Sequence, residues 1–206
     1  MKFALIIPMM IFLTAAQRPA APDSRPVILA YGDSLTAGFG MPAGSAYPEQ
    51  LQRKLDELGY RYRVVNMGIS GDTTSGGLAR LKPALNEKPS IVILELGAND
   101  GLRGLPLTLT KANLEEMVTA FRKIGATVVM AGMTLPRNYG ATYVKSFEDV
   151  FVDLAGKYQL HLIPFFLEGV AGKPQLTLPD FIHPNAAGYH IVVDIVMKTL
   201  KPLLKK

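Results

Sequence analysis

Five short runs rich in apolar residues, separated by segments with helical periodicity, limit the folds open to this chain more than any other feature. The clearest run covers residues 91–96, where Glu95 is the one polar residue. Such a run is typical of a strand buried on both faces of a parallel sheet, because a strand with one wet face would alternate polar and apolar residues. Residues 26–30 and 127–133 are also largely apolar, whereas the two other predicted strands, 62–65 and 159–163, mix apolar and polar residues.

The intervening segments carry apolar residues three and four positions apart, as one face of an α-helix requires. Pro48 fits the start of the first helix and Gly59 its end, and Pro184 is expected to open the last helix. Strand and helix therefore alternate along the chain. The alternation predicts an α/β fold of three layers, with a five-stranded parallel sheet between two layers of helices.

The first apolar run leads into the sequence Gly32-Asp33-Ser34, and a loop with three further glycines follows. This layout predicts a strand that delivers a serine to the carboxyl edge of the sheet, where open α/β sheets bind ligands. Ser34 is therefore the candidate nucleophile. An ordinary turn is the alternative for an isolated Gly-Asp-Ser triplet. The sequence also departs from the Gly-x-Ser-x-Gly nucleophile elbow, because Thr36 stands where the second glycine would be.

A serine needs a base to take its proton, and the segment 180–184 offers one. His183 follows Asp180 by three positions in a predicted loop, so the carboxylate can orient the imidazole and stabilise its cation. The alternative is that both residues cap the last helix. His161, between two leucines of a predicted strand, is expected to be structural, and His190 is expected on the polar side of the last helix.

Two glycine-containing stretches, 68–72 and 97–100, follow later predicted strands. Acyl transfer requires hydrogen-bond donors aimed at the oxyanion. The candidate donors are the backbone N–H groups of Ser34 and Gly71 and the side-chain amide of Asn99. A glycine turn and an Asx turn are the alternatives. Ser70 is a second candidate nucleophile, ranked below Ser34 because Asp72 occupies the position of an elbow glycine.

Together these four stretches resemble, in order, the sequence blocks of the SGNH or GDSL hydrolases. Residues 69–73, 95–104, 135–140 and 164–166 are most similar to the branch of that family with multifunctional periplasmic thioesterases and arylesterases. The resemblance implies a flavodoxin-like strand order 2-1-3-4-5. It implies a triad of Ser34, Asp180 and His183, and an oxyanion hole of Ser34, Gly71 and Asn99. The implied activity is cofactor-free hydrolysis of esters and thioesters through an acyl-enzyme, with arylesters and lysophospholipids among the substrates.

Apolar residues in loops at the expected active edge suggest a groove for a hydrophobic substrate. Ordinary packing of these loops onto the sheet is the alternative. Two other functions also stay open: a carbohydrate O-acetyl esterase with the same triad, and a non-catalytic ligand-binding module. The candidate substrate-binding residues are Met41, Leu102, Leu105, Leu135 and Tyr139.

Composition and the N-terminus set the broad class of the protein. Lys2, an apolar run and small residues at 14–16 predict a signal peptide over residues 1–16, and hence a periplasmic or secreted protein. Residues 17–25 are expected to be a flexible lead-in and residues 26–206 a single hydrolase domain. The dispersed histidines and the absence of cysteine leave no metal-ligand pattern. The net charge of +5 is spread along the chain without a basic run, so a nucleic-acid partner is not expected. The N-terminal apolar run is too short to span a bilayer and is expected to be removed, so stable membrane insertion of the mature chain is not expected either.

Overall fold

A computed structural model describes residues 23–206, so the predicted signal peptide and most of the lead-in lie outside the described residues. Five strands form one sheet in the order β2-β1-β3-β4-β5, and every neighbouring pair is parallel. The α/β class and the strand order are therefore confirmed. The strands are β1 (Val27–Gly32), β2 (Arg63–Gly68), β3 (Ile91–Glu95), β4 (Thr127–Ala131) and β5 (His161–Ile163).

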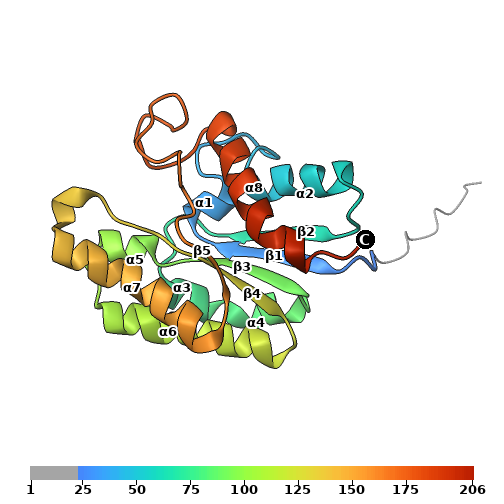
Figure 1. Cartoon of the computed structure of the whole chain (residues 1–206), viewed down its shortest axis with the longest axis horizontal. Helices are drawn as coiled ribbons and strands as arrows, with labels where there is room; N and C mark the ends of the chain where they lie inside the picture. Colours follow the sequence, from blue (N-terminus) through green and yellow to red (C-terminus); the bar gives the residue numbers. More distant parts are fainter. Residues whose placement is uncertain (1–22) are drawn as a thin grey trace, which may run out of the picture.

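Helices cover both faces of the sheet (Figure 1). One layer holds α2 (Tyr47–Glu57) and α8 (Ala186–Leu200), which pack against each other. The opposite layer holds α3 (Thr74–Ala79), α4 (Leu81–Asn86), α6 (Leu107–Lys123) and α7 (Ala141–Tyr158). Two short helices, α1 (Ser34–Ala37) and α5 (Ala98–Leu102), directly follow β1 and β3. From residue 23 onward, no helix is both long enough and apolar enough to cross a membrane.

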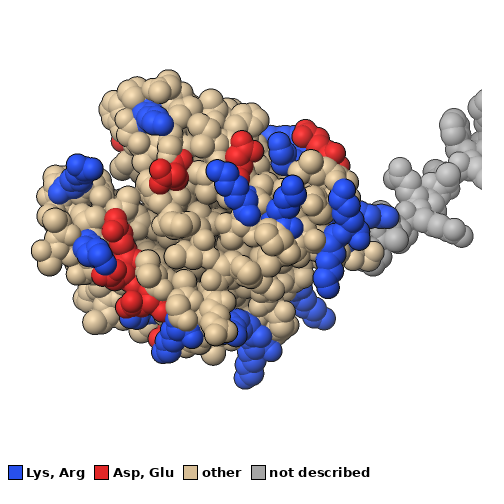
Figure 2. Space-filling view, viewed as in Figure 1, with Lys and Arg blue, Asp and Glu red and all other residues tan. Residues whose placement is uncertain are grey.

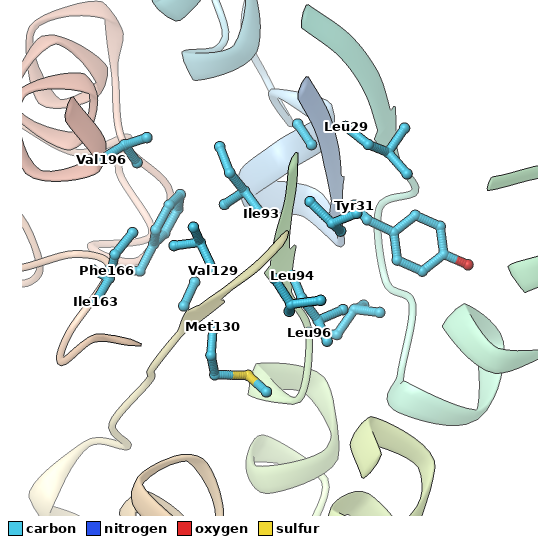
Figure 3. Close-up of a cluster of buried hydrophobic side chains, with 14 of the residues drawn as sticks. Leu29, Tyr31, Ile93, Leu94, Leu96, Val129, Met130, Ile163, Phe166 and Val196 are labelled. Carbon is cyan, nitrogen blue, oxygen red and sulfur yellow. The ribbon is translucent and has the colours of Figure 1, made fainter. Parts of the chain in front are cut away.

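The central strands β1, β3 and β4 are buried on both faces, as their apolar runs predict, whereas the edge strands β2 and β5 are partly exposed. Successive residues of one strand point to opposite layers, so Ile93 and Leu94 enter two different halves of the core (Figure 3). Ile93 faces the half that holds Phe166 and Val196, whereas Leu94 lies beside Met130. All five side chains are fully buried. This packing fixes the carboxyl ends of β1 and β3, from which functional loops emerge.

Several element boundaries differ from the sequence-based prediction. β2 extends to Gly68, whereas the apolar pattern stops near residue 65, because its last residues pair with β1 through backbone bonds that need no apolar side chain. Pro184 does not open the last helix. It forms an isolated bridge with Thr177, and Asn185 caps α8 by accepting the Gly188 N–H at 3.0 Å.

Gly68 lies against the turn that follows β1, and the closeness of this approach requires a glycine. A Cβ at this position would lie 2.1 Å from the backbone nitrogen of Ala37 and 2.6 Å from the carbonyl carbon of Thr36. Both are backbone atoms, so the clash cannot be relieved by a side-chain rotation. The end of β2 therefore supports the turn that contains Ser34.

We predict that Gly68→Ala lowers the free energy of unfolding by about 1–3 kcal/mol, the usual cost of overpacking. Gly156, inside α7, offers a matched control, because an added Cβ there meets no atom within 4 Å beyond its own helical turns. Gly156→Ala should raise the free energy of unfolding, by up to about 1 kcal/mol. Urea unfolding of both variants measures the difference, and equal stability would contradict the tight contact at Gly68.

Candidate active site

Ser34, His183 and Asp180 form one continuous row of hydrogen bonds at the carboxyl edge of the sheet. The Ser34 Oγ lies 2.9 Å from His183 Nε2, and His183 Nδ1 lies 2.6 Å from Asp180 Oδ2. Ser34 and His183 are 149 positions apart in the sequence, yet the fold brings them into direct contact. The arrangement allows the imidazole to accept the serine proton while the carboxylate stabilises the resulting cation.

The local backbone explains why Asp180 can hold His183. Its Oδ1 accepts the backbone N–H groups of Ile182 and His183, each at 2.9 Å, which leaves Oδ2 for the imidazole. Phe181 adopts a left-handed conformation (φ 59°) inside this turn. Partial burial works against the charge on Asp180, but these donors and the His183 ring outweigh it and hold the pKa of the carboxyl below its ordinary value. Asp180 thus holds the His183 imidazole by a hydrogen bond within the loop, and the alternative that the two residues cap α8 is wrong, because Asn185 is its N-cap.

The turn after β1 presents Ser34 at the first position of α1. Asp33 is the N-cap, and its Oδ1 accepts the Leu35 N–H at 3.0 Å. Burial raises the pKa of the Asp33 carboxyl to about 6, although the Leu35 N–H, His183 and Asn99 favour its charge. The Phe39 ring packs beside the imidazole of His183, with a centroid separation of 4.7 Å. The serine and its base therefore sit in a packed, partly buried setting.

The residues that carry the candidate oxyanion donors, Ser34, Gly71 and Asn99, line the same cleft. Within residues 23–206, the backbone N–H groups of Ser34 and Gly71 have no protein acceptor. Gly71 has φ of 84°, so this position favours glycine for its backbone conformation. The Asn99 amide donates to Asp33 Oδ2 at 3.1 Å and to the Asp72 carbonyl at 2.9 Å. An oxyanion at Ser34 would therefore have to take over one of the two amide hydrogens of Asn99.

Comparison with known proteins identifies the family. The family model described as GDSL-like lipase/acylhydrolase matches residues 30–191. The chain belongs to this family. The esterase TesA of Pseudomonas aeruginosa is 45% identical over 86% of this chain and 89% of that protein. The thioesterase 1/protease 1/lysophospholipase L1 of Escherichia coli is 37% identical over 96% of this chain and 93% of that protein. A solved structure of TesA is 44% identical and has a TM-score of 0.84, with coverage of 86% of this chain and 99% of the other.

A cleft of about 1110 Å³ opens beside Ser34 in this GDSL-like hydrolase. In Figure 2 the surface is hollowed between the loop before α8, at the upper left, and the start of α7, at the left. The walls of the cleft are mainly apolar, and two predicted substrate-binding residues, Leu102 and Leu135, belong to them. The other apolar wall residues include Phe39, Ala98, Met133, Pro136, Phe165, Leu167, Phe181 and Ile182.

Three predicted substrate-binding residues do not line this cleft, for separate reasons. Met41 packs against the core. Leu105 is half-buried in the turn before α6, where its N–H donates to the Asp100 carbonyl at 3.0 Å. The Tyr139 hydroxyl donates to the Leu102 carbonyl at 2.9 Å, so Tyr139 supports the loop that carries Leu102. Membership of a loop near the carboxyl edge of the sheet therefore does not suffice to predict which residues line the cleft.

The structure also shows where the other candidate polar residues, Ser70, His161 and His190, lie. Ser70 lines the cleft, but the imidazole of His183 bonds to Ser34, so Ser70 lacks this base. His161 and His190 are exposed on β5 and α8. In the part of the chain that the structure describes, no group of three or more His, Asp or Glu side chains is arranged to hold a metal ion.

Arg80 is the main supporting residue that sequence reasoning missed. Its guanidinium donates to the Asp72 carboxylate at 2.6 Å, the Met67 carbonyl at 2.7 Å and the Gly32 carbonyl at 2.8 Å. It also stacks over the Tyr31 ring, 4.2 Å from the centroid. The cation thus ties the ends of β1 and β2 to the loop that contains Gly71. Arg80 lies eight residues after Asp72, with α3 between them, and this spacing matches no recognisable sequence motif.

We predict that Arg80→Lys lowers the free energy of unfolding by about 1–3 kcal/mol, because an ammonium group cannot reproduce the planar fork that bonds two carbonyls and a carboxylate. The kcat for p-nitrophenyl acetate should fall as well, since the Gly71 loop loses its anchor. Urea unfolding and steady-state kinetics test both effects. A variant with unchanged stability and kcat would show that Arg80 does not hold this loop.

Proposed function

We propose that this chain is an exported serine hydrolase that cleaves carboxylic esters and thioesters through an acyl-enzyme on Ser34. The observation that carries the proposal is the hydrogen-bonded row from Ser34 Oγ through the His183 imidazole to Asp180. The row stands beside an apolar cleft and two backbone N–H groups without protein acceptors. Nucleophile, base, orienting acid and oxyanion donors are the four parts that acyl transfer needs.

In the first half of the reaction, His183 Nε2 takes the proton of Ser34 as Oγ attacks the substrate carbonyl. The tetrahedral oxyanion accepts hydrogen bonds from the Ser34 and Gly71 N–H groups and from the Asn99 amide. The imidazolium then protonates the departing alcohol or thiol, and the acyl group stays on Oγ. Water, deprotonated by His183, attacks the acyl-enzyme in the second half. The carboxylic acid leaves, and Ser34 regains its proton.

The cleft supports a substrate with an apolar acyl or aryl group. Its walls beside Leu102 and Leu135 are mainly carbon surface, which favours burial of methylene groups. The name of the Escherichia coli relative supports thioesters and lysophospholipids as further substrates, and Arg137 at the cleft provides a cation near which an anionic leaving group can lie. A carbohydrate O-acetyl esterase would use the same triad, but polar residues to bind sugar hydroxyls are few in this wall.

We predict that Ser34→Ala lowers kcat by roughly 10⁴ to 10⁶, the usual loss when a catalytic serine is removed. Ser70→Ala is the matched control, because Ser70 lines the same cleft and should leave kcat almost unchanged. Hydrolysis of p-nitrophenyl acetate by both purified variants provides the measurement. Should Ser70→Ala be the inactive variant, the nucleophile has been assigned to the wrong serine. Normal turnover by both variants would also exclude a serine acyl-enzyme at this site.

We predict that Leu102 sets part of the preference for acyl length. Each buried methylene adds at most about 0.8 kcal/mol to binding, or roughly fourfold in kcat/KM. Leu102→Gln should therefore flatten the rise of kcat/KM along a series of p-nitrophenyl esters. Leu109→Gln is the control, since Leu109 is exposed on α6 and does not line the cleft. Identical profiles for Leu102→Gln and wild type would exclude this role.

Export to the periplasm or the medium is part of the proposal and rests on the N-terminal sequence. Lys2, the apolar residues that follow and the small residues at 14–16 have the order of a signal peptide. The mature chain should begin near Gln17. N-terminal sequencing of protein from cell fractions tests this expectation, and intact Met1 on protein confined to the cytoplasm would contradict it.

A further inference from the structure

A buried glutamate lies directly beneath the turn that presents Ser34. Glu95 is the last residue of β3 and is fully buried beside Gly32 of β1. Its Oε2 accepts the Thr36 hydroxyl at 2.7 Å and the Asp33 backbone N–H at 3.3 Å. A Cβ on Gly32 would lie 2.4 Å from this oxygen and 2.0 Å from the Thr36 hydroxyl. Glu95 therefore connects β3 to residues on both sides of Ser34.

The surroundings of Glu95 do not favour a negative charge. The titratable groups that interact with it are Asp33 in the β1–α1 turn, Tyr47 of α2 and Tyr189 of α8. Each is acidic, and from residue 23 onward no Lys, Arg or His side chain bonds to Glu95. Burial, with the charge of Asp33 next, raises the pKa of Glu95 well above its ordinary value.

The two neighbouring carboxyl groups have different hydrogen-bond partners. Asp33 accepts the Leu35 N–H and the Asn99 amide, so it has the better environment for a charge. Glu95 Oε1, in contrast, is buried without a partner. An unpartnered oxygen costs far less on a neutral acid than on a carboxylate. The pair therefore favours one negative charge on Asp33 and one proton on Glu95.

We propose that Glu95 is a positioning residue that holds the Ser34 turn as a neutral carboxylic acid. In this form it accepts hydrogen bonds from Thr36 and Asp33 without adding a second negative charge beside Asp33. Asp33 then remains the single charge that holds Asn99 and faces His183. The role in catalysis rests on the proposed esterase function, whereas the protonation of Glu95 can be tested without activity.

The kinetic test compares Glu95→Gln with Glu95→Met. A glutamine amide keeps an acceptor for Thr36 and Asp33 and is neutral, so kcat for p-nitrophenyl acetate should stay within about threefold of wild type. Methionine has similar bulk but no oxygen, and its kcat should fall by about tenfold or more while KM changes little. If glutamine is as damaging as methionine, or if methionine is harmless, the proposal is overturned.

The second test measures stability against pH and does not depend on catalysis. From about pH 5 up to the folded-state pKa, an unfolded Glu95 has lost its proton, whereas the folded one keeps it. The folded state then binds more protons, so this group costs the wild type stability as pH rises towards the folded-state pKa. Glu95→Gln has no such proton, and its unfolding midpoint in urea should rise steadily relative to wild type over this range. Glu168→Gln, at an exposed loop position, is the control and should show a constant difference.

A pH-independent difference between Glu95→Gln and wild type would overturn the proposal. Should the substituted proteins fail to fold, ¹³C NMR of wild type labelled at glutamate Cδ decides the matter. One glutamate carboxyl should stay protonated at about pH 7, and a spectrum with all of them ionised would exclude a neutral Glu95. If Ser34→Ala instead proved fully active, the esterase mechanism would fail while the stability and NMR tests of Glu95 would still stand.

Discussion

The hydrogen bond between Ser34 and His183 is the contact that the rest of the fold must hold in place for the site to exist. The two residues are 149 positions apart, and nothing local holds them together. They meet because parallel strands place their carboxyl ends at one edge of the sheet, and because the order β2-β1-β3-β4-β5 puts β1 near its middle. The loop from β5 to α8 then returns across this edge with Asp180 and His183. The central strands β1, β3 and β4, which are buried on both faces, make the edge rigid enough to maintain a 2.9 Å contact.

Around this contact the core contains buried carboxyl groups at positions where apolar side chains would give a more stable protein. Asp33, Glu95 and Asp100 are almost fully buried, and each bonds to backbone or hydroxyl groups of the functional loops. A buried carboxyl costs free energy even when it is bonded. These carboxyl groups hold the functional loops, so that the hydrogen-bond donors of the loops are fixed before substrate binds. Fixed donors can stabilise an oxyanion without reorganisation. Arg80 also fixes a functional loop, since its hydrogen bonds connect the Gly71 loop to the ends of β1 and β2.

Much of this architecture could be predicted from the sequence, and the failures have physical causes. Apolar runs identified β1, β3 and β4, because burial on both faces leaves a strong pattern, whereas β2 and β5 are partly exposed and carry a weaker one. The strand order needed the family resemblance. The hydrogen-bonded row of Ser34, His183 and Asp180 could be anticipated because its residues stand in short motifs. The prediction that Pro184 opens the last helix was wrong, because a proline can also take part in an isolated β-bridge. Asn185 is the N-cap of α8. Met41 and Tyr139 were assigned to the substrate cleft because sequence gives loop membership but not side-chain direction. Arg80 and Glu95 contact segments that are distant in the sequence, and no local sequence motif predicts such contacts.

The central claim is that Ser34 becomes acylated because His183 activates it. Peptide mapping by mass spectrometry after exposure to a fluorophosphonate, which forms a stable adduct with an activated serine, tests this claim most directly. Wild type should carry one adduct, on the peptide that contains Ser34, and His183→Ala should react far more slowly at the same position. An adduct on Ser70 with Ser34 left free, or equal labelling of wild type and His183→Ala, would contradict the claim.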